Sequence, residues 1–300
     1  MKHNLKITAV LLSMFIVTQL IGIYVVGHYL NETNSLPYGL EPQMPETQAE
    51  YSGLFMTIVL AFIFAIALFF ILTKLKIEFI LRLWFFIVVT IALSISFLSF
   101  IPSSFKFALI ASSLGAAILA FIKIYKQNFF LHNLTELLIY PGIASIFVPI
   151  LNSYTIVILL ILISVYDMWA VWHSGIMQKM AKYQIDNLRI FSGFFVPYVS
   201  KKTKAQIKNW KNTLSKKELG KKKVRASVAI LGGGDVVFPI ITAGVMLKTL
   251  GLGSALFVTF GATLGLTYLF FFSEKKKFYP AMPFITAGIF LGMALSYFVF

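Results

Sequence analysis

The sequence predicts an all-α integral membrane protein with nine transmembrane helices, and its composition and the spacing of its apolar segments carry that prediction. Of the 300 residues, 59% are hydrophobic and 12% are charged, whereas soluble domains carry about 25% charged residues. A helix that crosses a bilayer needs about 20 mostly apolar residues. Nine segments meet this requirement: 5–29, 53–72, 83–101, 105–122, 134–151, 155–172, 226–247, 252–272 and 278–300.

The first of these segments is predicted to be a span and not a secretory signal. It follows Lys2 and Lys6, but its apolar core is longer than that of a signal peptide and no small-residue cleavage site follows it. The chain then divides into three parts: residues 1–172 with the first six helices, residues 173–225, and residues 226–300 with the last three.

Residues 173–225 are predicted to form a Lys-rich cytoplasmic loop with an amphipathic start. Ile176, Met180 and Tyr183 recur at helical spacing, which is typical of a helix that lies along a membrane surface. The apolar patch at 190–198 is too short to span, and residues 200–225 have the basic, apolar-poor composition of a mobile segment.

The distribution of positive charge predicts a cytoplasmic N-terminus and an external C-terminus. Positive residues collect on the cytoplasmic side of membrane proteins. With nine spans and the N-terminus inside, all but two of the 26 Lys and Arg residues fall on the inner side; the exceptions are Lys106 and Lys248. The first outer loop, between residues 30 and 52, carries four glutamates and no basic residue.

The composition also limits which chemistry and which partners are expected for this protein. There is no cysteine, so disulfides and thiol catalysis are excluded, and the four histidines show no paired ligand spacing, which predicts neither a metal nor another cofactor. The net charge of +15 is explained by topology. The basic loop is therefore expected to face anionic lipid of the bilayer, with no nucleic acid as a partner.

Two aspartates lie inside the apolar segments. Asp167 falls near the inner end of the sixth segment, and Asp235 lies about nine residues, or ~14 Å, into the seventh. An ionisable group in hydrocarbon costs at least ~2.5 kcal/mol and marks a functional site by default. Both acids are expected in the cytoplasmic half, where neighbouring helices would bring them together. Glu136, by contrast, is predicted to be interfacial.

Two carboxylates in contact suit the hydrolysis of a peptide bond. One keeps its proton and polarises the carbonyl, while the ionised partner takes a proton from water. Three successive glycines, Gly232, Gly233 and Gly234, precede Asp235 and leave room for another backbone. Pro280 and Pro283 interrupt the start of the last span, and irregular backbone at membrane depth is tolerated where it lines a cavity.

At these residues the chain resembles the presenilin and signal peptide peptidase family of intramembrane aspartyl proteases, and it is most similar to the prokaryotic members. That family carries Tyr-Asp in its sixth span, Gly-x-Gly-Asp in its seventh and Pro-Ala-Leu at its ninth. The corresponding residues here are Tyr166-Asp167, Gly232-Gly233-Gly234-Asp235 and Pro280-Ala281-Met282. The departures are Met282, of similar volume to leucine, and Gly233 at the variable position.

The resemblance implies that Asp167 and Asp235 are the catalytic pair. It also implies that Tyr166, Gly232, Gly233, Gly234, Pro280, Ala281 and Met282 support the site or bind substrate. The expected substrates are membrane-spanning peptides, and the expected location is a cell membrane, most simply that of a prokaryote. No counterpart of the presenilin maturation loop is present, so the intact chain is expected to act without an obligatory accessory subunit.

Two other functions stay open from the sequence. A proton-coupled transporter also uses buried carboxylates as a relay, although the internal repeats typical of transporters are not evident. A prepilin-type peptidase also uses a Gly-x-Gly-Asp aspartate, but its members resemble a shorter bundle. The paired Gly261 and Gly265, and Gly288 and Gly292, indicate close helix packing.

Overall fold

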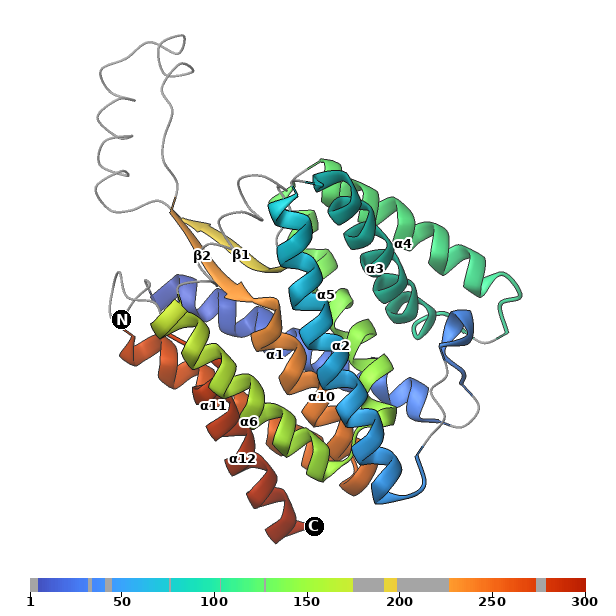
Figure 1. The fold of residues 1–300 in the computed structure, drawn as a ribbon. Coiled ribbons are helices and arrows are strands. Elements are labelled where there is room, and N and C mark those ends of the chain that lie inside the picture. Colours follow the sequence, from blue (N-terminus) through green and yellow to red (C-terminus); the bar gives the residue numbers. More distant parts are fainter. Residues whose placement is uncertain are drawn as a thin grey trace, which may run out of the picture.

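The computed structural model describes residues 5–31, 34–40, 45–75, 77–102, 104–126, 128–174, 192–198, 227–273 and 279–300. Within these ranges nine helices are long and apolar enough to cross a membrane, which confirms the predicted class (Figure 1). They are α1 (Leu5–Leu30), α2 (Gln48–Lys74), α3 (Glu78–Leu98), α4 (Ala108–Tyr125), α5 (Phe129–Phe147), α6 (Ser153–Trp169), α10 (Gly233–Leu250), α11 (Leu252–Phe272) and α12 (Met282–Val299). Short helical turns η1 (Pro37–Gly39), η2 (Val148–Ile150) and η3 (Ala170–Ser174) complete the helical part.

Two of the helices begin at polar caps that the local sequence provides. The Asn128 side chain accepts hydrogen bonds from the first backbone N–H groups of α5. Asn152 and Thr155 form a reciprocal capping box at the start of α6. Such caps satisfy backbone donors that have no partner within the helix.

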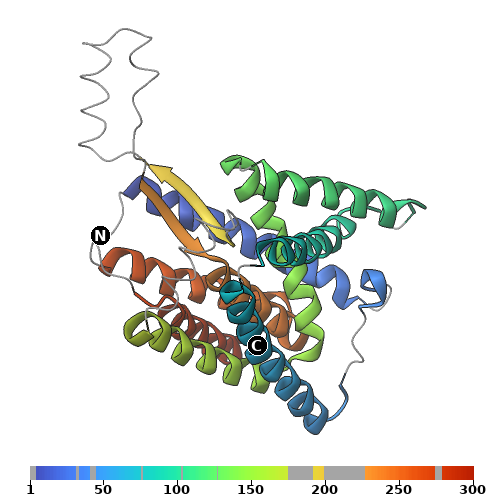
Figure 2. The same cartoon turned by 45° about the horizontal axis from the view of Figure 1, so that its top comes forward.

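The structure corrects the predicted start of the seventh span. Residues Ser227–Gly232 form a strand, β2, that pairs antiparallel with β1 (Gly193–Tyr198), so the apolar patch predicted as a loop is also a strand (Figure 2). In β2 the side chains alternate, since Val228 and Ile230 are exposed whereas Ala229 and Leu231 are buried. This period of two belongs to a strand, and the helix starts only at Gly233. The predicted amphipathic segment from residue 176 and the Lys-rich segment 200–225 lie outside the described residues.

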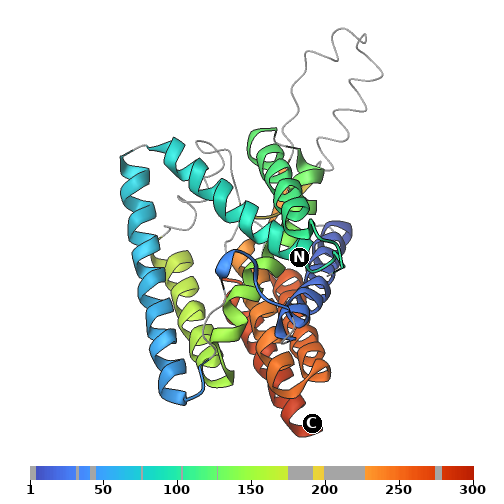
Figure 3. The ribbon, with the colours of Figure 1, turned by 90° about the vertical axis from the view of Figure 1, so that its right-hand side faces the viewer.

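The core is built around α10, which packs against α1, α5, α11 and, more lightly, α6 and α12. Its central residues Ile240, Ala243 and Val245 are fully buried. α12 is held between α11 and α6, and α3 packs against α4 and α5. In Figure 3, α2 stands beside α6 at the edge of the molecule, and no residue of its apolar stretch Gln48–Leu68 is buried.

The contact between α11 and α12 is a contact between backbones. A Cβ placed on Gly261 would overlap the carbonyl oxygen of Gly288, and a Cβ on Gly265 would overlap that of Phe284. A Cβ on Gly292 would likewise overlap the carbonyl oxygen of Phe257. The predicted role of these glycines in close helix packing is thereby confirmed, because only glycine permits so short an approach.

The first turns of α5 hold strand β1 through side chains. The side-chain amide of Asn133 and the backbone of Phe195 exchange two hydrogen bonds. Asn133 Nδ2 donates to Phe195 O (2.7 Å), and Phe195 N donates to Asn133 Oδ1 (2.9 Å). His132 Nε2 lies 2.8 Å from Gly193 O. These contacts fix β1, and through its pairing they fix the strand that leads into α10.

Beside these contacts lies a buried ion pair, where the sequence predicts an interfacial acid. Lys123 Nζ of α4 lies 2.5 Å from Glu136 Oε1 of α5, and both side chains are almost completely buried. The Tyr140 hydroxyl, one turn further along α5, lies beside Glu136 and Ser192. Glu136 is therefore an interior residue, because the lysine of the neighbouring helix compensates its charge.

Candidate active site

Asp167 lies near the end of α6, at the point where this helix meets the start of α12. Its side chain is 6% exposed, and its Oδ2 accepts a hydrogen bond from the backbone N–H of Met282 at 3.0 Å. The backbone of Ala281 is a second donor to the same carboxylate. One turn away, Ser164 Oγ donates to Thr286 Oγ1 at 2.9 Å. The Pro280-Ala281-Met282 segment therefore positions Asp167 through its backbone.

Asp235 lies in the first turn of α10, not nine residues into a span. Gly232 is the residue at the N-cap of this helix, and the Asp235 carboxylate accepts a hydrogen bond from its backbone. An acidic side chain three residues after the N-cap that bonds back to it is half of a capping box. A Cβ on Gly232 would lie 3.1 Å from Asp235 Oδ2, so the glycine leaves the carboxylate room to fold back.

The two aspartates lie close enough to interact electrostatically. Their helices α6 and α10 pack against each other, and α12 contacts both. Each carboxylate also lies at a helix N-terminus, Asp235 at that of α10 and Asp167 at that of α12. A helix N-terminus carries the equivalent of roughly half a positive charge. Two such termini offset part of the repulsion between two acids held in an apolar interior.

The three glycines before Asp235 have different surroundings. A Cβ on Gly233 would lie 2.6 Å from Ser192 Oγ and 2.8 Å from the Tyr140 hydroxyl, and the Gly233 N–H donates to Ser192 O at 3.3 Å. Gly234 is exposed, and the nearest atom to its Cβ position belongs to Phe238 at 3.7 Å. The central glycine is thus packed against α5, whereas the third is exposed and has room for a Cβ.

The remaining predicted site residues fall into two groups. Pro280 and Met282 are buried and Ala281 is half-buried, so the segment that bonds Asp167 is itself fixed by packing. Tyr166 is 40% exposed, and its ring packs near that of Trp169, with ring centroids 6.4 Å apart. The structure therefore places Tyr166 next to Asp167 in the chain, but on the outer side of α6.

Directly after Asp167, α6 changes its winding. Residues Ala170–Ser174 form a π-helix, η3. Such turns are rare and occur often at functional sites. No pattern in the sequence predicts this change of winding.

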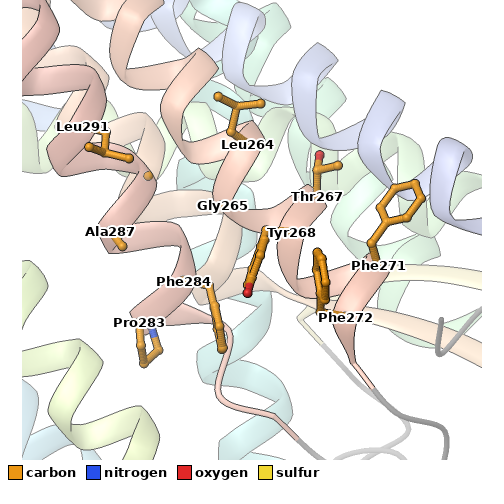
Figure 4. A pocket seen from close by; sticks show the side chains of 11 residues that line it. Leu264, Gly265, Thr267, Tyr268, Phe271, Phe272, Pro283, Phe284, Ala287 and Leu291 are labelled. Atoms are coloured by element: carbon orange, nitrogen blue, oxygen red, sulfur yellow. The ribbon is translucent and has the colours of Figure 1, made fainter.

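A groove of about 780 Å³ runs between α11 and α12 (Figure 4). Its walls are mostly apolar, with Tyr268 and Phe272 from α11 and Pro283 and Phe284 from α12. Pro283 and Leu291 line this groove, whereas Met282 and Thr286 bond to α6. The groove therefore opens on the face of α12 that points away from the aspartates, and Pro283 belongs to it.

One polar residue that contacts the first turn of α10 is not among the predicted site residues. Gln19 of α1 is fully buried, and its Nε2 donates to the carbonyl oxygen of Val236 at 3.0 Å. A polar residue in the middle of an apolar segment was the available signal. Among the described residues, no cluster of three or more His, Cys, Asp or Glu side chains is placed to hold a metal ion.

A pair of interacting carboxylates inside a bundle of apolar helices defines an aspartic-type site within a multispan membrane protein. Comparison with known families agrees with this class. The family profile described as "Signal-peptide peptidase, presenilin aspartyl protease" matches residues 9–300. The chain belongs to this family and is an intramembrane aspartyl protease.

Solved structures show the same fold. Two crystal forms of a presenilin family intramembrane aspartate protease, in space groups C222 and P2, each superpose with a TM-score of 0.60 at 18% sequence identity. The first covers 98% of this chain and 99% of the solved chain, and the second covers 97% of each. The search of curated proteins gave no match.

Proposed function

We propose that Asp167 and Asp235 are the catalytic pair with which this protease cuts membrane-spanning peptides. One observation carries the proposal: the two acids, more than sixty residues apart in the chain, interact across α6 and α10. The first-turn amides of α12 hold one of them and the N-cap of α10 holds the other. An apolar helix bundle would not retain two carboxyl groups without such compensation.

In the proposed reaction the pair carries a single proton. The ionised carboxylate takes a proton from a water molecule, whose oxygen adds to the scissile carbonyl carbon, while the protonated carboxyl donates its proton to the carbonyl oxygen. The resulting tetrahedral diol collapses when a proton passes to the amide nitrogen and the C–N bond breaks. Only the acids and water take part, so the chemistry needs no cofactor.

The glycines supply the space that an extended substrate requires. Gly234 is exposed next to Asp235 in the chain and carries no side chain of its own, which leaves room there for a peptide backbone. Gly232 and Gly233 act in the protein's own packing, against Asp235 and Tyr140 respectively. Pro280, Ala281 and Met282 support Asp167. Tyr166 precedes Asp167 on α6 and lies on the outer side of this helix.

The orientation that fits the charge distribution has the N-terminus in the cytoplasm and the C-terminus outside. It puts the loop of residues 173–225 and both acids on the cytoplasmic side of a cell membrane, for which a prokaryotic plasma membrane is the simplest setting. Helix directions support an alternating path, since α1 and α10 run parallel, whereas α6 and α12 run antiparallel. The intact chain is proposed to work without accessory subunits.

Replacement of either acid by its amide tests the proposal. Asp167→Asn and Asp235→Asn remove one protonation site each, so each variant should lose cleavage of a reconstituted single-span peptide by about a hundred- to ten-thousandfold, the typical cost of losing an essential acid or base. The cleavage products are measured by mass spectrometry. Glu78→Gln is the control, because this exposed acid at the start of α3 lies in an i,i+4 pair with Arg82.

Normal activity in either aspartate variant contradicts the proposed pair. Folding must be checked in parallel, and thermal unfolding in detergent serves that purpose. A variant that unfolds at the same temperature as the wild type but does not cleave separates chemistry from folding.

A further inference from the structure

We infer that Gln19 is a positioning residue: its hydrogen bond to the first turn of α10 fixes where the Asp235 carboxylate lies in the site. It lies in the middle of α1 and is completely buried. Its Nε2 donates to the carbonyl oxygen of Val236, the residue directly after Asp235, at 3.0 Å. The inference rests on the proposed role of Asp235, and it adds a residue from the helix most distant in sequence from the site.

The first turn of α10 needs a tie from outside the helix. Three glycines precede or begin it, and each weakens a helix by up to about 1 kcal/mol relative to alanine. Pro239 lies inside α10 and has no N–H, so the carbonyl of Asp235 receives no bond from the residue four positions on. The turn that carries the acid is therefore held less firmly by its own backbone than a regular helical turn.

The side of α1 that carries Gln19 fits the side of α10 that carries Asp235. One turn after Gln19, Gly22 lies against Ile240, and a Cβ there would overlap that side chain. One turn further, Val26 lies 3.0 Å from the Cβ position of Gly244. The two helices thus interlock along their length, and the Gln19 hydrogen bond fixes their register at the end where the acid lies.

The surroundings of Gln19 are not those of a residue that only stabilises the fold. Its Oε1 is buried without a hydrogen-bond partner among the described residues. An unpaired buried acceptor is unfavourable for folding. An apolar side chain of similar length would remove that penalty, so positioning and stability make opposite predictions for the same substitution.

The decisive variant is Gln19→Met, which keeps the length of the side chain and removes the amide. We expect its kcat for a reconstituted single-span peptide to fall about ten- to a hundredfold, because a displacement of about 1 Å at a reacting group costs up to ~10²-fold. KM should change little, since the substrate contacts are untouched. The melting temperature should be equal to or higher than that of the wild type.

A second readout reports on the acids directly. A peptide with a secondary alcohol in place of the scissile carbonyl resembles the tetrahedral diol and contacts both carboxylates, so its affinity should fall in parallel with kcat. Thr18→Val is the matched control. Thr18 is the buried neighbour of Gln19, but its hydroxyl donates to Met14 O within α1, so kcat should be retained.

An unchanged kcat in Gln19→Met overturns the inference, and so does a loss of kcat in Thr18→Val as large as that in Gln19→Met. A second apolar variant, Gln19→Leu, tests stability: if the melting temperature falls in both Gln19→Met and Gln19→Leu by enough to account for the lost activity, the inference is also overturned. Asp235→Asn is measured alongside to separate this inference from the proposed function. If Asp235→Asn stays active, the catalytic pair is wrong; if it is inactive while Gln19→Met has normal kcat, only the role of Gln19 is wrong.

Discussion

Gly233 and Gly234 are neighbours of the same type, yet the structure gives them opposite tolerance for a side chain. In Gly233→Ala the new Cβ would press on Ser192 Oγ and the Tyr140 hydroxyl at 2.6 and 2.8 Å. We expect a loss of about 1–3 kcal/mol in the free energy of unfolding, as in other overpacked sites. Thermal unfolding in detergent measures it.

Gly234→Ala is the matched comparison, because its nearest contact is 3.7 Å. Alanine in a helix is favoured over glycine by roughly 0.5–1 kcal/mol, so this variant should unfold at the same or a higher temperature. A larger destabilisation by Gly234→Ala than by Gly233→Ala would contradict the packing described for the central glycine.

At the residue scale the sequence predicted the two acids, and the resemblance implied that Pro280, Ala281 and Met282 support them, but Gln19 was not predicted. The aspartates are visible because charge is rare in apolar segments. Gln19 was overlooked because an uncharged amide stands out less, and its partner is a backbone carbonyl more than two hundred residues away. The contact between Met282 N–H and Asp167 could be anticipated only in outline, from the prolines that interrupt the start of α12.

At the scale of elements, the buried Lys123–Glu136 pair joins α4 to α5 next to the contacts that hold β1. Glu136→Gln would leave Lys123 charged in the interior, where its further hydrogen-bond partners among the described residues are His132 and Thr135. Removal of one partner of a buried ion pair typically costs about 3–5 kcal/mol. We expect a marked fall in thermal stability, measured as the melting temperature.

The exposed Glu78–Arg82 pair supplies the comparison for this prediction. Its charged atoms are 3.7 Å apart, and both side chains are about one-third exposed. Exposed pairs of this kind contribute at most about 1 kcal/mol, so Glu78→Gln should unfold close to the wild-type temperature. Similar melting temperatures for the two variants would show that Glu136 is not the buried partner described.

The strand β2 was the element that the sequence misassigned. Its apolar run continues without a break into α10, and a continuous apolar run does not distinguish a strand from a helix by hydrophobicity alone. The strand forms because β1, a distant segment of the chain, supplies the backbone partners. The triple glycine lies at the boundary between strand and helix, inside the range 226–247 that the apolar pattern predicts as a single helix.

At the scale of the whole molecule, the predicted orientation can be tested cleanly because the chain has no cysteine. Ser35→Cys introduces an exposed thiol in the loop between α1 and α2, and Lys126→Cys introduces one between α4 and α5. A membrane-impermeant maleimide should label the first in intact cells and the second only after permeabilisation. The reverse pattern would invert the proposed topology.

The number and order of the helices were predictable, because each needs only a long apolar segment, whereas several of their ends were not. Their neighbours in space were not, since hydrophobicity is nearly uniform around these helices. The position of α2 is an example: its apolar stretch resembles the others in hydropathy, but it lies exposed at the edge of the bundle. Lys248 of α10 binds the Tyr51 hydroxyl at 3.0 Å and so ties one end of α2 to the core.

The contact of bare backbones between α11 and α12 limits how α12 can move. No side chain separates the two helices at Gly261, Gly288 or Gly292, so they cannot approach further, and separation would lose contacts along their whole length. A slide of a single turn, about 5.4 Å, would carry the Met282 N–H out of reach of Asp167 and leave that carboxylate without its main anchor.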